Sequence, residues 1–221
     1  MRLLLALVSV VLLTGAAPRR DWNAVANKTP AGAYVIGNPA ARVKLVEYAS
    51  YTCSHCAAFS GESEAVLHKK MIASGSTSLE IRHFVRDKLD LAAAILARCT
   101  GARGFAGTTA AIFAAQPTWL QRGIDFQQAN GARIGLYPTQ AQLRANADGA
   151  GLTALVKARG LSDAAIGACF ADQAEIDRIV ALTSNAPSEI DSTPTFYVNG
   201  KRVPHAAWAQ LEPALRAAGA K

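Results

Sequence analysis

The chain has 221 residues, of which 51% are hydrophobic and 18% are charged, and its formal net charge is +7. This length suits one domain, or one domain with an insertion, and the apolar fraction is ample for a hydrophobic core. The basic residues are spread along the chain, and no dense basic run interleaves with aromatic residues. The composition therefore disfavours a nucleic-acid-binding protein, and the excess of positive charge bears only on solubility and on acidic partners.

The first residues predict a secretory signal peptide over residues 1–17. Arg2 precedes an apolar run and a group of small residues that ends at Ala17. This order is typical of a cleavable signal, here cut after Ala16 or Ala17, and the apolar run is too short to anchor the chain in a bilayer. The alternative is a buried N-terminal helix. We expect an exported, periplasmic protein in which residues 18–33 form a mobile leader.

A strand, a helix and a second strand are predicted in the next part of the chain. Residues 43–48 form an apolar run typical of a buried strand, residues 53–73 have helical spacing, and residues 79–85 alternate between apolar and polar types. A short strand at 34–36 precedes them. The order strand, helix, strand predicts a parallel pair joined by a right-handed crossover.

The middle of the chain, from about residue 89 to 184, has helical spacing almost throughout. Helices are expected at 89–99, at 108–115 with a stop at Pro117, at 139–159, and from an N-cap at Ser162. The last helix is predicted to carry one buried stripe, formed by Ile166, Cys169, Phe170, Ile176, Ile179 and Val180.

Strand signals return near the C-terminus. The expected elements are a strand at 195–198, a turn at Asn199-Gly200, a strand at 201–203 and a helix at 206–218. The chain is therefore of the α/β class, with a β-α-β half, a helical insertion and a β-β-α half, whose expected bounds are 34–86, 87–187 and 188–219.

Cys53 and Cys56 form a Cys-x-x-Cys motif at the predicted start of the first helix. The unpaired N–H groups and the dipole of a helix N-terminus stabilise a thiolate, so we expect Cys53 to be an exposed nucleophile. Cys56, one turn further, is placed to close a disulfide with Cys53 and to resolve a mixed disulfide. The alternatives are a structural disulfide and half of a zinc site, although no second pair of residues has metal-ligand spacing.

The whole arrangement resembles the bacterial DsbA-like thiol:disulfide oxidoreductases of the thioredoxin superfamily. The residues that carry the resemblance are Glu47, the Cys53–Cys56 motif with His before its second cysteine, and Thr193-Pro194. The resemblance implies a thioredoxin fold with an inserted α-helical domain. It also implies that no metal or organic cofactor is needed, because the Cys53–Cys56 disulfide is itself the redox group.

The resemblance also assigns roles to residues around the motif. His55 would add positive charge or a hydrogen bond at the Cys53 sulfur, although Ser54-His55 departs from the Pro-His dipeptide that is common in the family. Glu47 would exchange protons with Cys56, since a carboxylate in a buried strand is costly unless it has a use. The alternative for Glu47 is an exposed position at a strand edge.

Thr193 and Pro194 would form a cis peptide bond beside the cysteines, where the backbone pairs with a substrate peptide. The alternative is an ordinary trans proline at the start of an edge strand. Cys99 and Cys169 lie on apolar helical faces, and exported proteins rarely leave two such thiols free. We therefore predict a structural disulfide between them, the alternative being two buried free cysteines.

The expected function is that of a periplasmic oxidoreductase that introduces disulfides into unfolded exported proteins with free cysteines. The resemblance implies a membrane redox partner that reoxidises it, and we expect a monomer that binds no nucleic acid. The first rival is a disulfide isomerase or reductase kept in the reduced state, which Thr193 before Pro194 favours. The short stretch between the signal and the first strands disfavours it, because it leaves no room for a dimerisation domain. The second rival is a non-catalytic chaperone or binding module on a thioredoxin scaffold.

Overall fold

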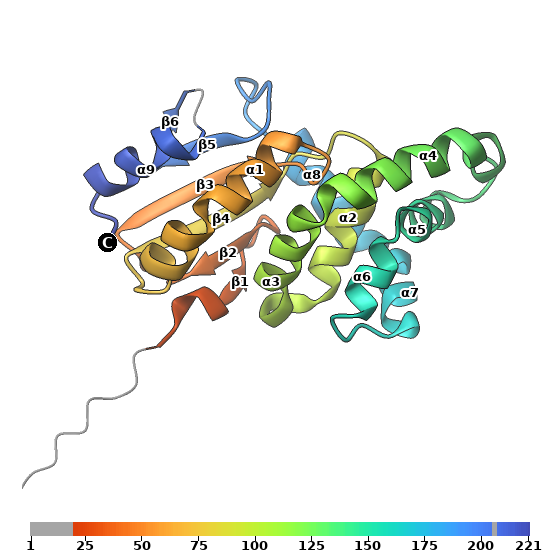
Figure 1. Cartoon of the computed structure of the whole chain (residues 1–221), viewed down its shortest axis with the longest axis horizontal. Helices are drawn as coiled ribbons and strands as arrows, with labels where there is room; N and C mark the ends of the chain where they lie inside the picture. The colour runs from red at the N-terminus through yellow and green to blue at the C-terminus, as the bar shows by residue number, and fades with distance from the viewer. Residues whose placement is uncertain (1–19, 205–206) are drawn as a thin grey trace, which may run out of the picture.

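The structure is a computed structural model that describes residues 20–204 and 207–221 (Figure 1). The signal peptide expected over residues 1–17 lies outside the described residues. Where a mobile leader was expected, the chain forms a 3-10 helix, η1 (Trp22–Ala24), and a strand, β1 (Ala26–Lys28). That expectation is wrong for these residues because β1 pairs with the next strand in an antiparallel register.

Within the described residues, the strands form one mixed sheet in the order β1-β2-β4-β3-β5-β6. Its central pair, β3 and β4, is parallel as predicted, and the other neighbours are antiparallel. Asn199 and Gly200 have φ values of 49° and 79°, so they make the tight turn predicted between the last two strands. The strands that follow β1 are β2 (Tyr34–Gly37), β3 (Val43–Ala49), β4 (Thr77–His83), β5 (Thr195–Val198) and β6 (Lys201–Val203).

The predicted helix over 53–73 is present as two joined pieces, α1 (Ser54–Ser63) and the π-helix η2 (Glu64–Ile72). It lies in front of the sheet in Figure 1 and buries a row of apolar side chains, among them Phe59, Leu67 and Met71. The C-terminal helix α9 (Trp208–Ala217) lies next to α1. The rings of Phe59 and Trp208 are 6.2 Å apart there.

Between β4 and β5 the chain forms a helical lobe beside the sheet (Figure 1). The predicted stop before Pro117 is present, since α3 ends at Ala114, and Pro117 lies in the first turn of the next helix, α4, where its missing N–H has no helical acceptor to lose. The helices of the lobe are α2 (Lys88–Cys99), α3 (Gly101–Ala114), α4 (Gln116–Ile134), α5 (Thr139–Ala150), α6 (Leu152–Lys157), α7 (Asp163–Ala171) and α8 (Gln173–Ser184).

The last predicted helix of the lobe begins where expected but is broken in the middle. Ser162 caps α7, and its hydroxyl oxygen accepts a hydrogen bond from Ala165 N at 3.2 Å. Asp172 then ends α7 and caps α8, accepting from Glu175 N at 3.0 Å. Because the two helices are separate, they do not share one stripe, and Val180 is 44% exposed rather than buried as predicted.

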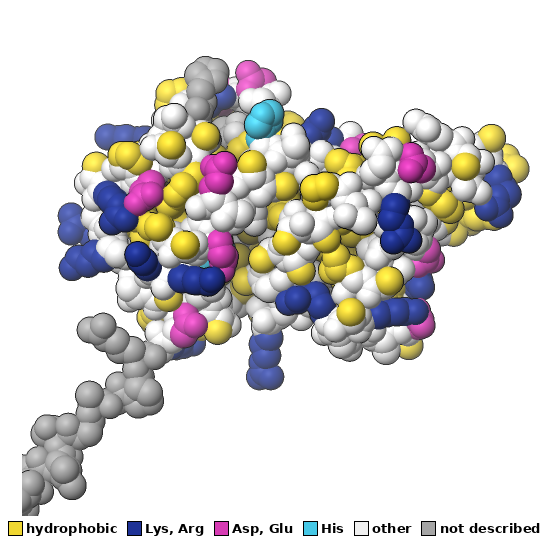
Figure 2. Space-filling view, viewed as in Figure 1, with side chains coloured by type: hydrophobic (Ala, Val, Ile, Leu, Met, Phe, Trp, Pro, Cys, Tyr) yellow, Lys and Arg dark blue, Asp and Glu magenta, His cyan; other side chains and the backbone are white. Residues whose placement is uncertain are grey.

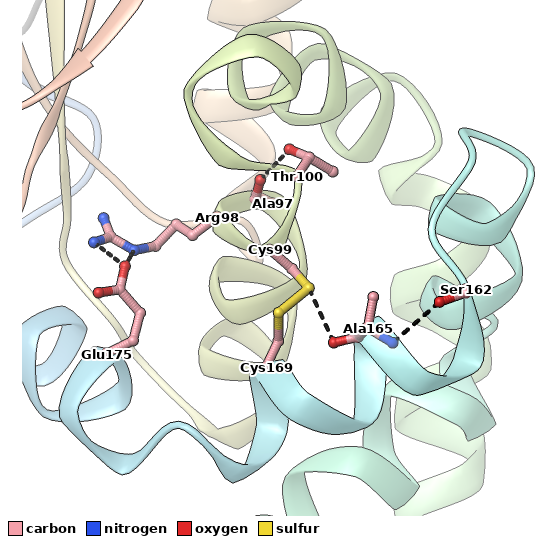
Figure 3. Close-up of a disulfide and its surroundings, with 8 residues drawn as sticks. All are labelled: Ala97, Arg98, Cys99, Thr100, Ser162, Ala165, Cys169 and Glu175. Atoms are coloured by element: carbon pink, nitrogen blue, oxygen red, sulfur yellow. Dashed lines mark hydrogen bonds and ion pairs between the residues drawn. A yellow bond between two sulfur atoms is a disulfide. The ribbon is translucent and has the colours of Figure 1, made fainter.

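A disulfide joins the C-terminal end of α2 to α7 (Figure 3). Cys99 and Cys169 are separated by 70 residues in sequence and their Cα atoms are 5.8 Å apart. Next to it, Arg98 is 4% exposed and donates to Glu175 Oε1 from Nε at 2.8 Å and from a terminal nitrogen at 2.5 Å. Lys28 of β1 also binds Glu175. These contacts tie α2 to α7, α8 and the sheet.

On the face of the molecule that Figure 2 shows, the basic side chains do not gather in one place. Figure 2 shows Lys and Arg scattered over the visible face, at both ends of the molecule. Among the described residues, no helix is both long and apolar enough to cross a membrane.

We expect the double variant Cys99→Ala/Cys169→Ala to unfold more easily than its parent. Opening a loop of this length raises the chain entropy of the unfolded state, and the loop-entropy model gives a loss of about 4 kcal/mol in the free energy of unfolding. Denaturant unfolding in a Cys53→Ser/Cys56→Ser background measures this loss without interference from the first cysteine pair. An unchanged midpoint and slope would contradict a stabilising role.

Candidate active site

Cys53 occupies the junction between the loop that follows β3 and the start of α1. Its backbone is extended, with φ −91° and ψ 119°, and its carbonyl oxygen accepts the first helical hydrogen bond from Ala57 N at 3.2 Å. Cys53 and Cys56 are free thiols, 4% and 0% exposed. The expected exposed nucleophile is therefore more deeply placed than predicted. Cys53 nevertheless forms part of the wall of a surface pocket of about 350 Å³, together with His55, Phe84, Arg86, Asp191, Ser192 and Thr193.

Hydrogen bonds lower the pKa of Cys53 to about 4. The largest effect comes from the thiol of Cys56, and burial of Cys53 opposes it. The side chain of Thr193 and the backbone N–H groups of Cys56 and His55 add smaller effects in the same direction. At neutral pH the site therefore holds Cys53 as a thiolate, the reactive form in disulfide exchange.

Cys56 has the opposite character. Burial raises the pKa of Cys56 far above its ordinary value, and the hydrogen bond to Cys53 and the charge of Glu47 raise it further. Cys56 therefore keeps its proton and donates a hydrogen bond to the Cys53 sulfur. One thiol of the pair is ready to react while the other stabilises it.

Glu47 lies in β3 and is 2% exposed, so the alternative of an exposed strand edge is wrong. Burial raises the pKa of Glu47 to about 8, and the charge of Cys53 adds to this effect. Its Oε1 has no hydrogen-bond partner among the described residues. A narrow cavity of about 20 Å³ touches Glu47 and is large enough for one water molecule. A carboxyl group in this state can hold or release a proton near neutral pH.

The peptide bond between Thr193 and Pro194 is cis. It lies directly beside the reactive thiol, since Cys53 Sγ is 3.2 Å from the carbonyl oxygen of Thr193, to which the thiol form donates. A second pocket, of about 410 Å³, adjoins this point and is lined by His55, Ala58, Phe59, Glu62, Thr193, Pro194, Ala207 and Trp208. His55 and Thr193 line both pockets, so the two pockets adjoin each other and together form an open groove beside Cys53.

The structure brings together the predicted residues Glu47, Cys53, His55, Cys56, Thr193 and Pro194. Cys99 and Cys169 lie apart from them, in the helical lobe (Figure 3). The ring of His55 is exposed, and the described effect of this residue on Cys53 comes from its backbone N–H.

Sequence reasoning missed two buried polar residues next to the motif, Asp90 and Gln116, which are 1% and 3% exposed. Asp90 could have been suspected, because it places a charge among the alanines and leucines of the predicted helix 89–99. Gln116 gives no such signal. Among the described residues, no three His, Cys, Asp or Glu side chains are grouped so that they could hold a metal ion.

The chain is similar in sequence and in structure to known proteins. A family model described as thioredoxin matches residues 29–217. A solved protein-disulfide isomerase from Novosphingobium aromaticivorans is 30% identical, with a TM-score of 0.76 over 83% of this chain and 95% of that one. The alpha-DsbA1 of Wolbachia pipientis, at 22% identity and a TM-score of 0.64 over 83% of this chain and 88% of that one, shares the fold.

Sequence relatives match over a shorter stretch. A protein of Rickettsia typhi, named as a protein-disulfide oxidoreductase, is 45% identical over 67 residues, which are 30% of this chain and 25% of the relative. A similar protein of Rickettsia prowazekii is 46% identical over the same length and share of each chain. This chain thus matches only about a quarter of the length of these curated relatives.

We expect Cys56→Ala to raise the pKa of Cys53 by at least about one unit, because it removes the largest of the stabilising hydrogen bonds. The titration of thiolate absorbance in the reduced protein measures this shift. Ser54→Ala, at an exposed position of the same helical turn, is the control and should leave the titration in place. A Cys56→Ala variant that still titrates near pH 4 would show that Cys56 is not the main donor.

We expect Glu47→Gln to stabilise the reduced protein at neutral pH. Burial raises the pKa of Glu47 from 4.5 to about 8, so the folded state binds this proton more tightly than the unfolded state does. The resulting stability is fully present below pH 4.5 and is lost as the pH rises through 8. Compared with the neutral amide of glutamine, the carboxyl group therefore lowers the free energy of unfolding at pH 7 by about 3 kcal/mol.

Denaturant unfolding of the reduced protein at pH 5, 7 and 9 tests this expectation, since the advantage of Glu47→Gln should grow with pH. The control is Glu62→Gln, at an exposed position on α1, which should change the free energy of unfolding by less than about 0.5 kcal/mol. An advantage that is equal at all three pH values would contradict the raised pKa.

Proposed function

Because the chain belongs to the thioredoxin family and has the DsbA-like helical insertion, we propose that it is a periplasmic thiol:disulfide oxidoreductase that introduces disulfides into exported proteins. The observation that carries this proposal is the contrast between the acidic thiol of Cys53 and the buried thiol of Cys56. Stabilising the Cys53 thiolate favours the reduced pair, so the oxidised pair readily gives up its disulfide to a substrate.

The disulfide would be transferred to a substrate in two exchange steps. A substrate thiolate attacks Cys53 Sγ in the Cys53–Cys56 disulfide, which forms a mixed disulfide and releases Cys56 as a thiolate. Cys56 then takes a proton, and the proposed donor is the buried carboxyl group of Glu47, whose charge acts on Cys56. A second substrate thiolate attacks the substrate sulfur of the mixed disulfide and releases the Cys53 thiolate. The substrate loses two electrons and the protein gains them.

The groove beside Cys53 suits an extended, unfolded substrate. Thr193 lines both of its pockets, and the pocket that Pro194 also lines includes the apolar rings of Phe59 and Trp208. The substrates proposed are therefore unfolded exported proteins with free cysteines. A membrane redox partner would then oxidise the Cys53–Cys56 pair again, and the protein would act as a monomer.

A disulfide isomerase is the second candidate. The neighbour from Novosphingobium aromaticivorans is named as a protein-disulfide isomerase, and Thr193 precedes the cis proline here, which favours this role. The low pKa of Cys53 favours the oxidase, because a strongly stabilised thiolate is a good leaving group.

A glutathione redox titration of the protein without residues 1–17 tests the proposal, with alkylation and mass spectrometry to read each cysteine. The Cys53–Cys56 pair should be reduced under conditions that leave Cys99–Cys169 oxidised. The oxidised protein should also oxidise a reduced, unfolded substrate faster than it rearranges a scrambled one.

Cys53→Ser and Cys56→Ser should each abolish this activity, because neither variant can form the disulfide that is donated to the substrate. A Cys53–Cys56 pair as hard to reduce as Cys99–Cys169 would rule out the oxidase. Faster rearrangement than oxidation would indicate the isomerase. Binding of unfolded protein that survives Cys53→Ser/Cys56→Ser, with no exchange by the wild type, would indicate a chaperone or binding module.

A further inference from the structure

The loop that carries Cys53 is held by the helical lobe. Gln116 is the first residue of α4 and is 3% exposed. Its Nε2 donates to the carbonyl oxygen of Tyr51 at 2.7 Å and to that of Cys53 at 2.9 Å. The two hydrogens of one amide group thus bind two backbone carbonyls on either side of Thr52.

The hydrogen bond from Gln116 to Cys53 holds the backbone at the point where helix α1 begins. The carbonyl of Cys53 belongs to the peptide plane that leads into α1, and its orientation sets where the first N–H groups of the helix point. No hydrogen bond from the Cys53 side chain caps the helix, so the side chain does not fix this orientation. The amide of Gln116 and the helical bond from Ala57 N are the contacts that hold this oxygen.

A second buried side chain of the lobe holds the same loop from another direction. Asp90 of α2 accepts hydrogen bonds from Tyr51 N at 2.7 Å and from Ser50 Oγ at 2.6 Å. It also accepts from Arg86 N at 3.0 Å, in the segment that follows β4. Tyr51 therefore has its N–H bound by Asp90 and its carbonyl bound by Gln116, which leaves the loop little freedom to turn.

We propose that Gln116 is a positioning residue for the exchange reaction. By holding the carbonyl groups of Tyr51 and Cys53, it fixes the backbone that presents the Cys56 thiol and the first N–H groups of α1 to the Cys53 sulfur. The proposal deepens the function proposed above and rests on it for its consequence in exchange. Its geometric part, the control of the Cys53 environment by a residue of the insertion, rests only on the two hydrogen bonds of Gln116.

The test compares Gln116→Met with Trp119→Phe. Methionine keeps the length of glutamine and removes both donors. Trp119 lies one turn further along α4, is 3% exposed, and donates from Nε1 to the carbonyl oxygen of Ile112 at 2.8 Å. Trp119→Phe therefore removes a buried hydrogen bond from the same helix without touching the loop of Cys53.

We expect Gln116→Met to raise the pKa of Cys53 in the reduced protein by about one unit and to move the glutathione ratio at half-reduction about tenfold towards more reducing conditions. Trp119→Phe should lower the free energy of unfolding but leave both quantities at their wild-type values. A Gln116→Met variant with wild-type thiolate titration and wild-type glutathione equilibrium would overturn the proposal, whatever its stability.

If Gln116→Met does not fold, Gln116→Asn provides the same test, because its shorter amide cannot reach both carbonyls. A wild-type titration in that variant would equally overturn the proposal. A failure of this proposal can be distinguished from a failure of the proposed function. If the wild type fails to oxidise protein substrates while Gln116→Met still shifts the titration, the oxidase assignment fails and the positioning role stands.

Discussion

The hydrogen bonds donated to the Cys53 sulfur exist in full only while the two cysteines are reduced, because closing the disulfide removes both the thiolate charge and the Cys56 thiol proton. Every contact that strengthens them stabilises the reduced form relative to the disulfide. The environment of the Cys53 sulfur atom therefore determines how strongly the disulfide oxidises other thiols. The rest of the structure can be understood as what holds that environment in place.

The central strand β3 supplies the acid that this chemistry needs, at a cost in stability. Glu47 pairs with Ile81 on one side and Phe196 on the other, and its side chain lines a small cavity together with Phe59 of α1. The same burial that makes the group costly also raises its pKa into the range where it can exchange a proton with Cys56. A surface carboxylate would destabilise the folded state less, but it would remain ionised at neutral pH and would be a poor proton donor.

The features that could be predicted from the sequence are those that depend on residues close together in the chain. Cys53 and Cys56 follow an apolar strand and begin a helix, and Asn199-Gly200 separates two strand runs, so each pattern is complete within a few residues. The break at Asp172 was missed because Ile166 to Ile179 continue the helical spacing across it, and a capping aspartate in mid-pattern looks like any exposed residue. The strand β1 was missed because its short sequence gains stability only by pairing with β2.

The environment of Cys53 was harder to predict, because it depends on residues that are far from the motif in sequence. The low exposure of Cys53 and the contacts of Thr193 and Gln116 arise only when the two halves of the fold and the insertion meet. Pattern reasoning could place the two thiols but could not show what surrounds them.

The helix α2 explains how an insertion remote from the motif can hold it so firmly. At its first turn Asp90 binds the backbone beside Cys53, and at its last turn Cys99 is bonded to Cys169 while Arg98 is buried against Glu175. A helix fixed at its far end by a covalent bond and a partly buried ion pair offers a rigid support for the groups at its near end. Since Cys99–Cys169 lies in the lobe rather than in the groove, the support can remain oxidised while Cys53 and Cys56 pass between their two states. The insertion therefore acts as part of the active site through its backbone contacts, although the reacting sulfur atoms belong to the thioredoxin half.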